Sequence, residues 1–179
     1  MGNKVVKFGG SSLADANQFR KVADIIKSDE KRAYVVPSAP GKRFSDDIKI
    51  TDMLYKCAEL AGSGMDFSEP FNAIKDRYNG IISELGMDVS LDNEFEAIAA
   101  ELKARPSNDF AASRGEFLNG KLLAAYLGYE FVDAADVIIF DTNGMLLLDE
   151  TVSAVRARLK DVKNAVIPGF YGRTTEGYV

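Results

Sequence analysis

The sequence of 179 residues contains no histidine and a single cysteine, Cys57. Without histidine, the chain cannot use a Ser-His-Asp or Cys-His mechanism, and it cannot bind a metal through imidazole. A single cysteine excludes an intrachain disulfide and a cysteine-cluster metal site, which fits a reducing compartment. Any catalysis must therefore rely on Lys, Arg, Asp, Glu, hydroxyl groups and backbone N–H groups. That set suits the neutralisation of charge on phosphoryl groups.

Positive charge and long apolar runs are also scarce. The chain has 22 Lys and Arg against 27 Asp and Glu, a formal net charge of -5, and no large basic block. Phosphate contacts need clustered Lys and Arg, so we do not expect nucleic acid as a partner. The apolar runs VIIF and MLLL are too short to span a bilayer, and no long apolar signal region follows Met1. We therefore expect a cytoplasmic protein with no membrane partner.

The hydrophobic pattern predicts that the chain opens with a βαβ unit. The β-branched run at 5–8 reads as a buried strand that ends at a glycine pair. A helix is predicted over about 15–28, where Asp15 and Gln18 resemble a capping box, and a second strand over 33–36. Strands separated by one helix are expected to be parallel, with a right-handed crossover.

The middle of the chain is predicted to be helical before the strands return. Helical patterns cover about 48–61, 71–85, 95–102 and 107–127. Two apolar segments that end in an acidic residue, 129–133 and 136–141, read as strands. Asn143-Gly144 lies between VIIF and MLLL and predicts a hairpin there. Asp141 is interpreted as part of that turn and not as a metal ligand, because no neighbour has ligand spacing.

The order of elements predicts an α/β sandwich. A helix over about 150–160 and a strand within 165–170 follow the hairpin, and 169–179 reads as a loop. Because no capping element follows that loop, we expect the chain to be part of a longer protein.

The stretch KFGGSS places Lys7 at the end of the first strand, next to Gly9 and Gly10. Glycines between a strand and a helix let the backbone approach a ligand and present N–H groups to phosphate oxygens. Lys7 would supply the charge that bridges such oxygens. The pattern is not a Walker A loop. Taken alone, an ordinary tight turn with a lysine that reaches into solvent is the simpler interpretation.

Two hydroxyl residues follow in the loop after the second strand and at the start of the next helix. Ser38 is expected beside the first strand, at the carboxyl edge where open α/β sheets bind ligands. The hydroxyl of Thr51 could hold a carboxylate near a helix N-terminus. Taken alone, each residue is more simply explained as an exposed loop or surface residue.

Glu116 lies in the predicted long helix, away from its apolar stripe. The other residues on its face are small or polar: Ala112, Asn119 and Gly120. Such a face suits a ligand ammonium, and the alternative is an ion pair with Arg114 or Lys121. Gly115 costs the helix about 1 kcal/mol relative to Ala, which indicates a packing or functional reason for it.

Together and in this order, the segments resemble the aspartate kinases. They are KFGGSS at 7–12, VVPSAPGKR at 35–43, KITD at 49–52, SRGE at 113–116 and IPGFYG at 167–172. That family uses ATP to phosphorylate the side-chain carboxylate of L-aspartate to 4-phospho-L-aspartate, the first step toward lysine, threonine and methionine. The resemblance implies the amino-acid kinase (carbamate kinase-like) fold, an αβα sandwich around a mainly parallel sheet.

The resemblance also implies a role for each site residue. Lys7 would neutralise charge on the transferred phosphoryl group. The residues implied to bind the nucleotide are Lys7, Phe8, Gly9, Gly10 and Ser11. Those implied to bind aspartate are Ser38, Thr51 and Glu116, with Glu116 as the partner of the substrate ammonium. Gly169 and Phe170 would lie near the nucleotide cleft. ATP would bring Mg²⁺, and the full-length protein is expected to be a homo-oligomer.

The sequence departs from the family pattern after IPGFYG. There the family continues with an Arg-Gly-Gly-Ser-Asp run, an adenine-binding segment and regulatory ACT domains, which this sequence does not contain. Residues 1–179 are therefore expected to be the amino-terminal, aspartate-binding portion of the kinase domain, without an ACT domain and inactive alone. The alternatives are another amino-acid kinase, acting on a carboxylate, carbamate or nucleotide, and a non-catalytic binding module that retains the half-fold.

Overall fold

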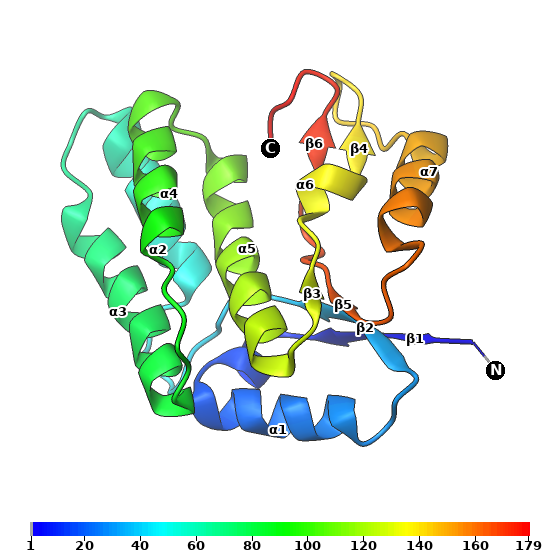
Figure 1. Ribbon diagram of the computed structural model, residues 1–179. Helices are drawn as coiled ribbons and strands as arrows, with labels where there is room; N and C mark the ends of the chain where they lie inside the picture. The colour runs from blue at the N-terminus through cyan, green and yellow to red at the C-terminus, as the bar shows by residue number, and fades with distance from the viewer. Residues whose placement is uncertain (1) are drawn as a thin grey trace.

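The chain forms a parallel sheet with helices on both faces, as a computed structural model describes it for residues 2–179 (Figure 1). The four strands lie in the order β1 (Lys4–Phe8), β2 (Arg32–Pro37), β5 (Ala165–Val166) and β3 (Glu130–Phe131). Every pair of neighbours in this sheet is parallel. The predicted α/β class and mainly parallel sheet are confirmed.

The predicted βαβ unit is also confirmed. A short 3-10 helix, η1 (Gly10–Leu13), and then α1 (Ala16–Lys27) connect β1 to β2. The Asp15 side chain caps α1 because it accepts a hydrogen bond from the backbone N–H of Gln18, at 2.9 Å. The apolar stripe of α1, which includes Phe19 and Ile26, is fully buried against the sheet and its neighbours.

Four long helices make up the middle of the chain. They are α2 (Ile50–Gly62), α3 (Ser68–Leu85), α4 (Asp92–Ala104) and α5 (Asn108–Leu127). Figure 1 shows α5 between the sheet and the layer of α2, α3 and α4. The main core joins these helices and α1 to one face of the sheet, which includes Val35 and Val166. The left-handed backbone of Gly128, with φ of 71°, ends α5 where the sequence predicted.

The opposite face of the sheet is covered by a smaller group of elements. These are α6 (Ala134–Val137), β4 (Ile139–Phe140), α7 (Leu148–Leu159) and β6 (Arg173–Thr174). A second apolar cluster, which includes Val132 and Val155, joins this group to the sheet. Helices on both faces make the αβα sandwich that the resemblance implied.

The strand predicted at 136–141 is confirmed only for the two residues of β4, and the hairpin predicted after it is confirmed as a turn with a single antiparallel bridge. The Asp133 side chain accepts a hydrogen bond from the N–H of Ala135, and this cap starts α6 where a strand was expected. Gly144 does form the turn, with φ of 79°, and Asp141 accepts hydrogen bonds from the backbone there. The turn leads to an isolated antiparallel bridge between Phe140 and Leu146.

The chain after residue 169 contains a strand where a loop was predicted. In β6, the N–H of Arg173 donates to the carbonyl of Ile138, at 2.9 Å, and β6 pairs in parallel with β4. Gly172 permits this approach, since a Cβ there would lie 2.4 Å from the Ile138 carbonyl oxygen.

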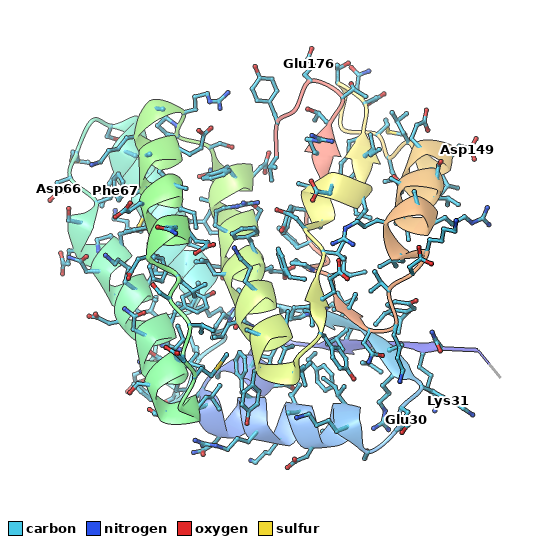
Figure 2. All side chains as sticks on the ribbon, viewed as in Figure 1. Glu30, Lys31, Asp66, Phe67, Asp149 and Glu176 are labelled. Atoms are coloured by element: carbon cyan, nitrogen blue, oxygen red, sulfur yellow. The ribbon has the colours of Figure 1, made fainter. Side chains whose placement is uncertain are left out.

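Figure 2 shows charged side chains such as Glu30, Asp149 and Glu176 at the periphery. Within residues 2–179, none of the helices combines the length and the hydrophobicity that a membrane span requires.

Candidate active site

Two loops meet at the carboxyl edge of β1 and β2, and their backbones are in direct contact. The N–H of Ser38 donates to the carbonyl of Phe8, and the N–H of Gly41 donates to that of Gly10, both at 2.9 Å. A Cβ on Gly10 would lie 2.9 Å from the Ala39 carbonyl oxygen, and one on Gly41 would lie 2.7 Å from the Gly10 carbonyl carbon. Both glycines are therefore required by the contact between the two loops.

Gly9 differs from Gly10, because the space around it is open. No atom beyond Gly9 itself and its two chain neighbours lies within 4 Å of where its Cβ would be, and its backbone is extended, with φ of -77°. Ser11, in η1, is exposed beside it. A ligand can therefore approach the backbone closely at Gly9. The side chain of Phe8 packs against the main core.

The two loops bring Lys7 and Ser38 together. The exposed Lys7 ammonium lies 3.4 Å from the hydroxyl oxygen of Ser38, although 31 residues separate them in sequence. The parallel register pairs Lys7 with Val36, and Ser38 follows two residues after Val36, just beyond the end of the paired strands. The sequence prediction that these two residues share one edge of the sheet is confirmed.

Glu116 faces this same edge from α5. Burial raises the pKa of its half-buried carboxyl above the ordinary value. The nearby backbone N–H groups of Gly169 and Phe170, the positive charge of Lys7 and the hydroxyl of Ser38 oppose that rise. The structure therefore brings Glu116, Lys7, Ser38 and the 169–170 segment into one site.

The alternative pairing of Glu116 with Arg114 or Lys121 is wrong. Lys121 forms its ion pair with Glu94 on α4. The guanidinium carbon of Arg114 lies 4.6 to 5.0 Å from the centres of three aromatic rings, those of Phe110, Phe117 and Tyr171. Glu116 is thus left to face the sheet edge.

Gly115 and Asn119 hold α5 close to the loop that carries Ser38. A Cβ on Gly115 would lie 2.8 Å from the Cβ of Ala39 and 3.2 Å from Cγ2 of Ile50. The buried Asn119 donates from Nδ2 to the carbonyl oxygen of Ser38, at 2.6 Å. Close packing is therefore the reason for a glycine within this helix.

Thr51 is the second residue of α2 and is half-buried. The residue before it, Ile50, is in the contact with Gly115, and its N–H donates to the carbonyl of Pro40. The start of α2 thus adjoins the residue that precedes Glu116. That Thr51 binds substrate stays a prediction.

The 168–171 segment is anchored on the other side of Glu116. The Tyr171 hydroxyl donates to Oδ1 of Asp133, at 2.8 Å, and its ring packs on Arg114. A Cβ on Gly120 would lie 2.8 Å from Cγ of Pro168, so α5 also approaches this segment closely. Sequence reasoning missed these anchors, because each joins residues far apart in the chain.

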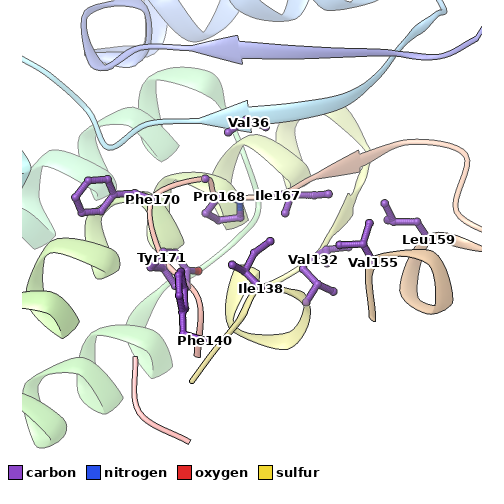
Figure 3. Close-up of a pocket in the computed structure, with 12 residues that line it drawn as sticks. Val36, Val132, Ile138, Phe140, Val155, Leu159, Ile167, Pro168, Phe170 and Tyr171 are labelled. Atoms are coloured by element: carbon purple, nitrogen blue, oxygen red, sulfur yellow. The ribbon is translucent and has the colours of Figure 1, made fainter. Parts of the chain in front are cut away.

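An apolar cavity of about 260 Å³ lies next to this segment (Figure 3). Figure 3 shows Val36 of β2 on one side, Ile138, Val155 and Leu159 on the other, and Ile167 and Pro168 between them. Its lining contains no charged side chain, so it does not suit a phosphate or an amino acid.

Among residues 2–179, no group of three or more His, Cys, Asp or Glu is placed to hold a metal ion.

Comparisons with known proteins identify the family of this chain. The model of the amino acid kinase family matches residues 3–179. Aspartokinase 3 of Bacillus subtilis is 37% identical over 98% of this chain and 42% of its own length. The chloroplastic aspartokinase 1 of Arabidopsis thaliana is 31% identical over 94% of this chain and 33% of its own length.

Solved structures give the same result. Clostridium acetobutylicum aspartate kinase is 46% identical, with a TM-score of 0.95, over 99% of this chain and 41% of that protein. E. coli aspartokinase III, in complex with aspartate and ADP, shares the fold, with a TM-score of 0.78 and 24% identity over 97% of this chain and 42% of that one. This chain thus spans about two fifths of the length of these structures. It belongs to the amino acid kinase family, and within that family it is similar to the aspartokinases.

Proposed function

We propose that the protein to which this chain belongs is an aspartate kinase. It transfers the γ-phosphoryl group of ATP to the side-chain carboxylate of L-aspartate and forms 4-phospho-L-aspartate, the first step toward lysine, threonine and methionine. The observation that carries the proposal is the meeting of Lys7, Ser38 and Glu116 at the carboxyl edge of β1 and β2. The similarity to aspartokinases over nearly the whole chain supports it.

The residues divide between the two substrates. Glu116 binds the aspartate ammonium, because its carboxylate lies near Lys7, Ser38 and the backbone N–H groups of Gly169 and Phe170 at this edge. The hydroxyls of Ser38 and Thr51 bind the rest of aspartate. Lys7 neutralises charge between the two anions, and the backbone at Gly9, Gly10 and Ser11 lies against the nucleotide phosphates. The open space over Gly9 fits such a close approach.

The reaction needs no strong base. The nucleophile is a carboxylate oxygen, and an aspartate side chain, with a pKa of about 3.9, is already ionised at neutral pH. Catalysis then depends on aligning two anions and cancelling their repulsion. Mg²⁺ carried by ATP would add charge neutralisation at the phosphates. Lys7 supplies a fixed cation from the protein, in a chain that has no histidine.

We assign residues 1–179 to the amino-terminal, aspartate-binding portion of the kinase domain. The remaining part of the nucleotide site would come from segments outside this chain, so we expect residues 1–179 to be inactive alone. That the full-length protein forms a homo-oligomer stays a prediction.

A substrate panel tests the proposal on the full-length protein. ADP release with ATP-Mg²⁺ is measured in the presence of L-aspartate, L-glutamate, carbamate or a nucleoside monophosphate, and the acyl phosphate is trapped with hydroxylamine. Aspartate-dependent ADP release with a matching hydroxamate is expected. Turnover of another acceptor would favour a different amino-acid kinase. Aspartate binding with no turnover of any acceptor would favour a non-catalytic binding module.

A further inference from the structure

A buried arginine on α3 contacts the loop that joins β2 to α2. Arg77 is only 6% exposed. Its guanidinium donates to the Gly41 carbonyl oxygen at 3.1 Å and to the Ile48 carbonyl oxygen at 3.2 Å. It also donates to Oδ2 of Asp47 at 2.7 Å. One side chain therefore holds three points of the loop over residues 41–48.

The same guanidinium also reaches the first loop. It donates to the carbonyl oxygen of Ala14, which follows η1, at 3.4 Å. Since Gly10 and Gly41 are already in backbone contact, Arg77 lies behind both loops of the candidate site. Arg77 itself is in the middle of α3, and neither it nor Asp47 is among the residues proposed to touch substrate.

Asp47 is shared between two arginines. Its carboxylate is 8% exposed and accepts from Nε and one terminal nitrogen of Arg43, at 2.8 and 2.9 Å, as well as from Arg77. The side chain of Arg43 is 43% exposed, whereas that of Arg77 is 4% exposed. The contact of Asp47 with Arg77 is thus the buried part of this network, and the contact with Arg43 lies at the surface.

The chemistry of this contact favours a role in fixing conformation. A buried ion pair is a weak source of stability, because desolvation of both charges offsets their attraction. Packing of α3 alone would be served as well by an apolar side chain. Binding carbonyl oxygens and a carboxylate at once, however, requires several donors in a fixed geometry, which a guanidinium provides and an ammonium does not.

Two of the proposed aspartate-binding residues lie at the two ends of the loop held in this way. Ser38 lies at its start, where Phe8 and Asn119 hold the backbone. Thr51 follows its end, three residues after Ile48. Backbone contacts near Ser38 and the hydrogen bond from the N–H of Ile50 to the carbonyl of Pro40 hold the two ends of the loop. Arg77 and Asp47 fix residues 41–48, which lie between those ends.

We propose that Arg77 and Asp47 are positioning residues that fix the β2–α2 loop in the conformation in which Ser38 and Thr51 bind aspartate. This inference rests on the proposed function. When the pair is broken, the loop populates other conformations, and the apparent affinity for aspartate falls with the fraction of protein that remains competent.

The test uses the full-length protein with the variants Arg77→Lys and Asp47→Asn. Both keep most of the side-chain volume, and Asp47→Asn leaves the carbonyl contacts of Arg77 possible. We expect the KM for aspartate to rise by about ten-fold or more, since small misplacements of binding groups cost that much or more. The KM for ATP is expected to change less in Asp47→Asn, because Asp47 holds only the aspartate-binding loop.

Two controls separate positioning from general loss of stability. Arg105→Lys alters an exposed arginine that pairs with Glu101 on α4, and it should leave both KM values unchanged. Leu102→Ala opens a cavity at a fully buried position of α4 and should lower the thermal midpoint without raising the KM for aspartate.

Amide hydrogen exchange of the unliganded full-length protein gives a readout that needs no activity. Residues 38–50 should exchange faster in Arg77→Lys and Asp47→Asn, and not in Leu102→Ala. An unchanged KM for aspartate in an active Asp47→Asn protein, or unchanged exchange of this loop in both variants, would overturn the inference. If the wild-type protein does not turn over aspartate, the proposed function fails instead, and the exchange result still decides whether the pair fixes the loop.

Discussion

The Lys7 ammonium lies 3.4 Å from the Ser38 hydroxyl oxygen, across the ends of two parallel strands. The parallel register of β1 and β2 makes this meeting necessary, because it aligns residues near the ends of both strands at one edge. Glu116 then faces the same edge from α5. A cation, a hydroxyl and a carboxylate therefore share one site, and each can be tested separately.

Replacing Lys7 by Met in the full-length protein should lower kcat by about a hundred-fold or more, because a fixed positive charge aimed at the transition state is lost. The KM for aspartate should change little, since we assign aspartate binding to other residues. The fold should survive, because the side chain is exposed.

Steady-state kinetics against Lys4→Met provide the check. Lys4 is in the same strand but pairs with Asp29, so its replacement should leave kcat near the wild-type value. A Lys7→Met protein with normal kcat would remove Lys7 from the mechanism.

Replacing Glu116 by Gln should raise the KM for aspartate by about ten- to a hundred-fold, as expected for the loss of a charged hydrogen-bond partner of about 1.5–3 kcal/mol. Turnover at saturating aspartate should fall much less. The matched variant Glu96→Gln, on the exposed face of α4, should behave as wild type. Equal KM values in the two variants would contradict the assignment of the substrate ammonium to Glu116.

The pH dependence of aspartate binding follows from the same residue. Burial raises the pKa of Glu116, so the carboxylate takes up its proton at a higher pH than an exposed glutamate, whose pKa is about 4.3. Only the ionised form attracts an ammonium. The KM for aspartate should therefore rise as the pH falls through the elevated pKa of the free protein. In Glu116→Gln, the corresponding fall of kcat/KM for aspartate at low pH should be absent.

The two neighbouring glycines should respond differently to alanine. Gly10→Ala places a methyl group 2.9 Å from the Ala39 carbonyl oxygen, and we expect it to lower the free energy of unfolding by about 1–3 kcal/mol. Gly9→Ala meets no atom within 4 Å and should leave stability within about 0.5 kcal/mol. It should instead raise the KM for ATP. Urea denaturation and kinetics of both variants give the comparison, and equal destabilisation would show that the loop contact is misread.

The acid stability of the protein should depend on Asp47. Its hydrogen bonds from Arg43, joined by the charge of Arg77, hold the pKa of this carboxyl well below the ordinary range. Below about pH 3.9, an unfolded Asp takes up a proton while the folded Asp47 stays ionised, so its contribution to stability decreases as the pH falls.

Urea denaturation between pH 6 and pH 3 measures this effect. The free energy of unfolding should fall more steeply toward low pH in the wild type than in Asp47→Asn, which is less stable at pH 6. Parallel pH profiles for the two proteins would mean that the Asp47 pKa is not depressed.

The sequence predicted the elements whose signals are local. The stripe of α1 with its Asp15 cap, and the end of α5 at Gly128, are set by neighbouring residues and appear where expected. Lys7 and Ser38 could be placed together because parallel pairing follows from a βαβ pattern. Glu116 could be placed only on a face of small residues, and it was the resemblance to the aspartate kinases that added it to the site. The region around β4 could not be predicted in the same way. Its strand has two residues, pairs with β6 more than 30 positions away, and follows a four-residue helix.

The buried contacts behind the site were also beyond the reach of the sequence pattern. Arg77 adjoins Tyr78 on the apolar face of α3, and an arginine on such a face is a signal that could have been noticed. Its partner Asp47 lies in a polar loop, however, and only the folded chain brings the two together, 30 positions apart. The same holds for Tyr171 and Asp133, which are 38 positions apart.

The central claim is that Lys7, Ser38 and Glu116 form the site at which aspartate is phosphorylated. The most direct test is aspartate-dependent ADP release by the full-length protein with ATP-Mg²⁺, measured for the wild type, Lys7→Met and Glu116→Gln. We predict turnover by the wild type, a low kcat for Lys7→Met, and a raised KM for aspartate for Glu116→Gln. Wild-type turnover that neither substitution alters would contradict the claim.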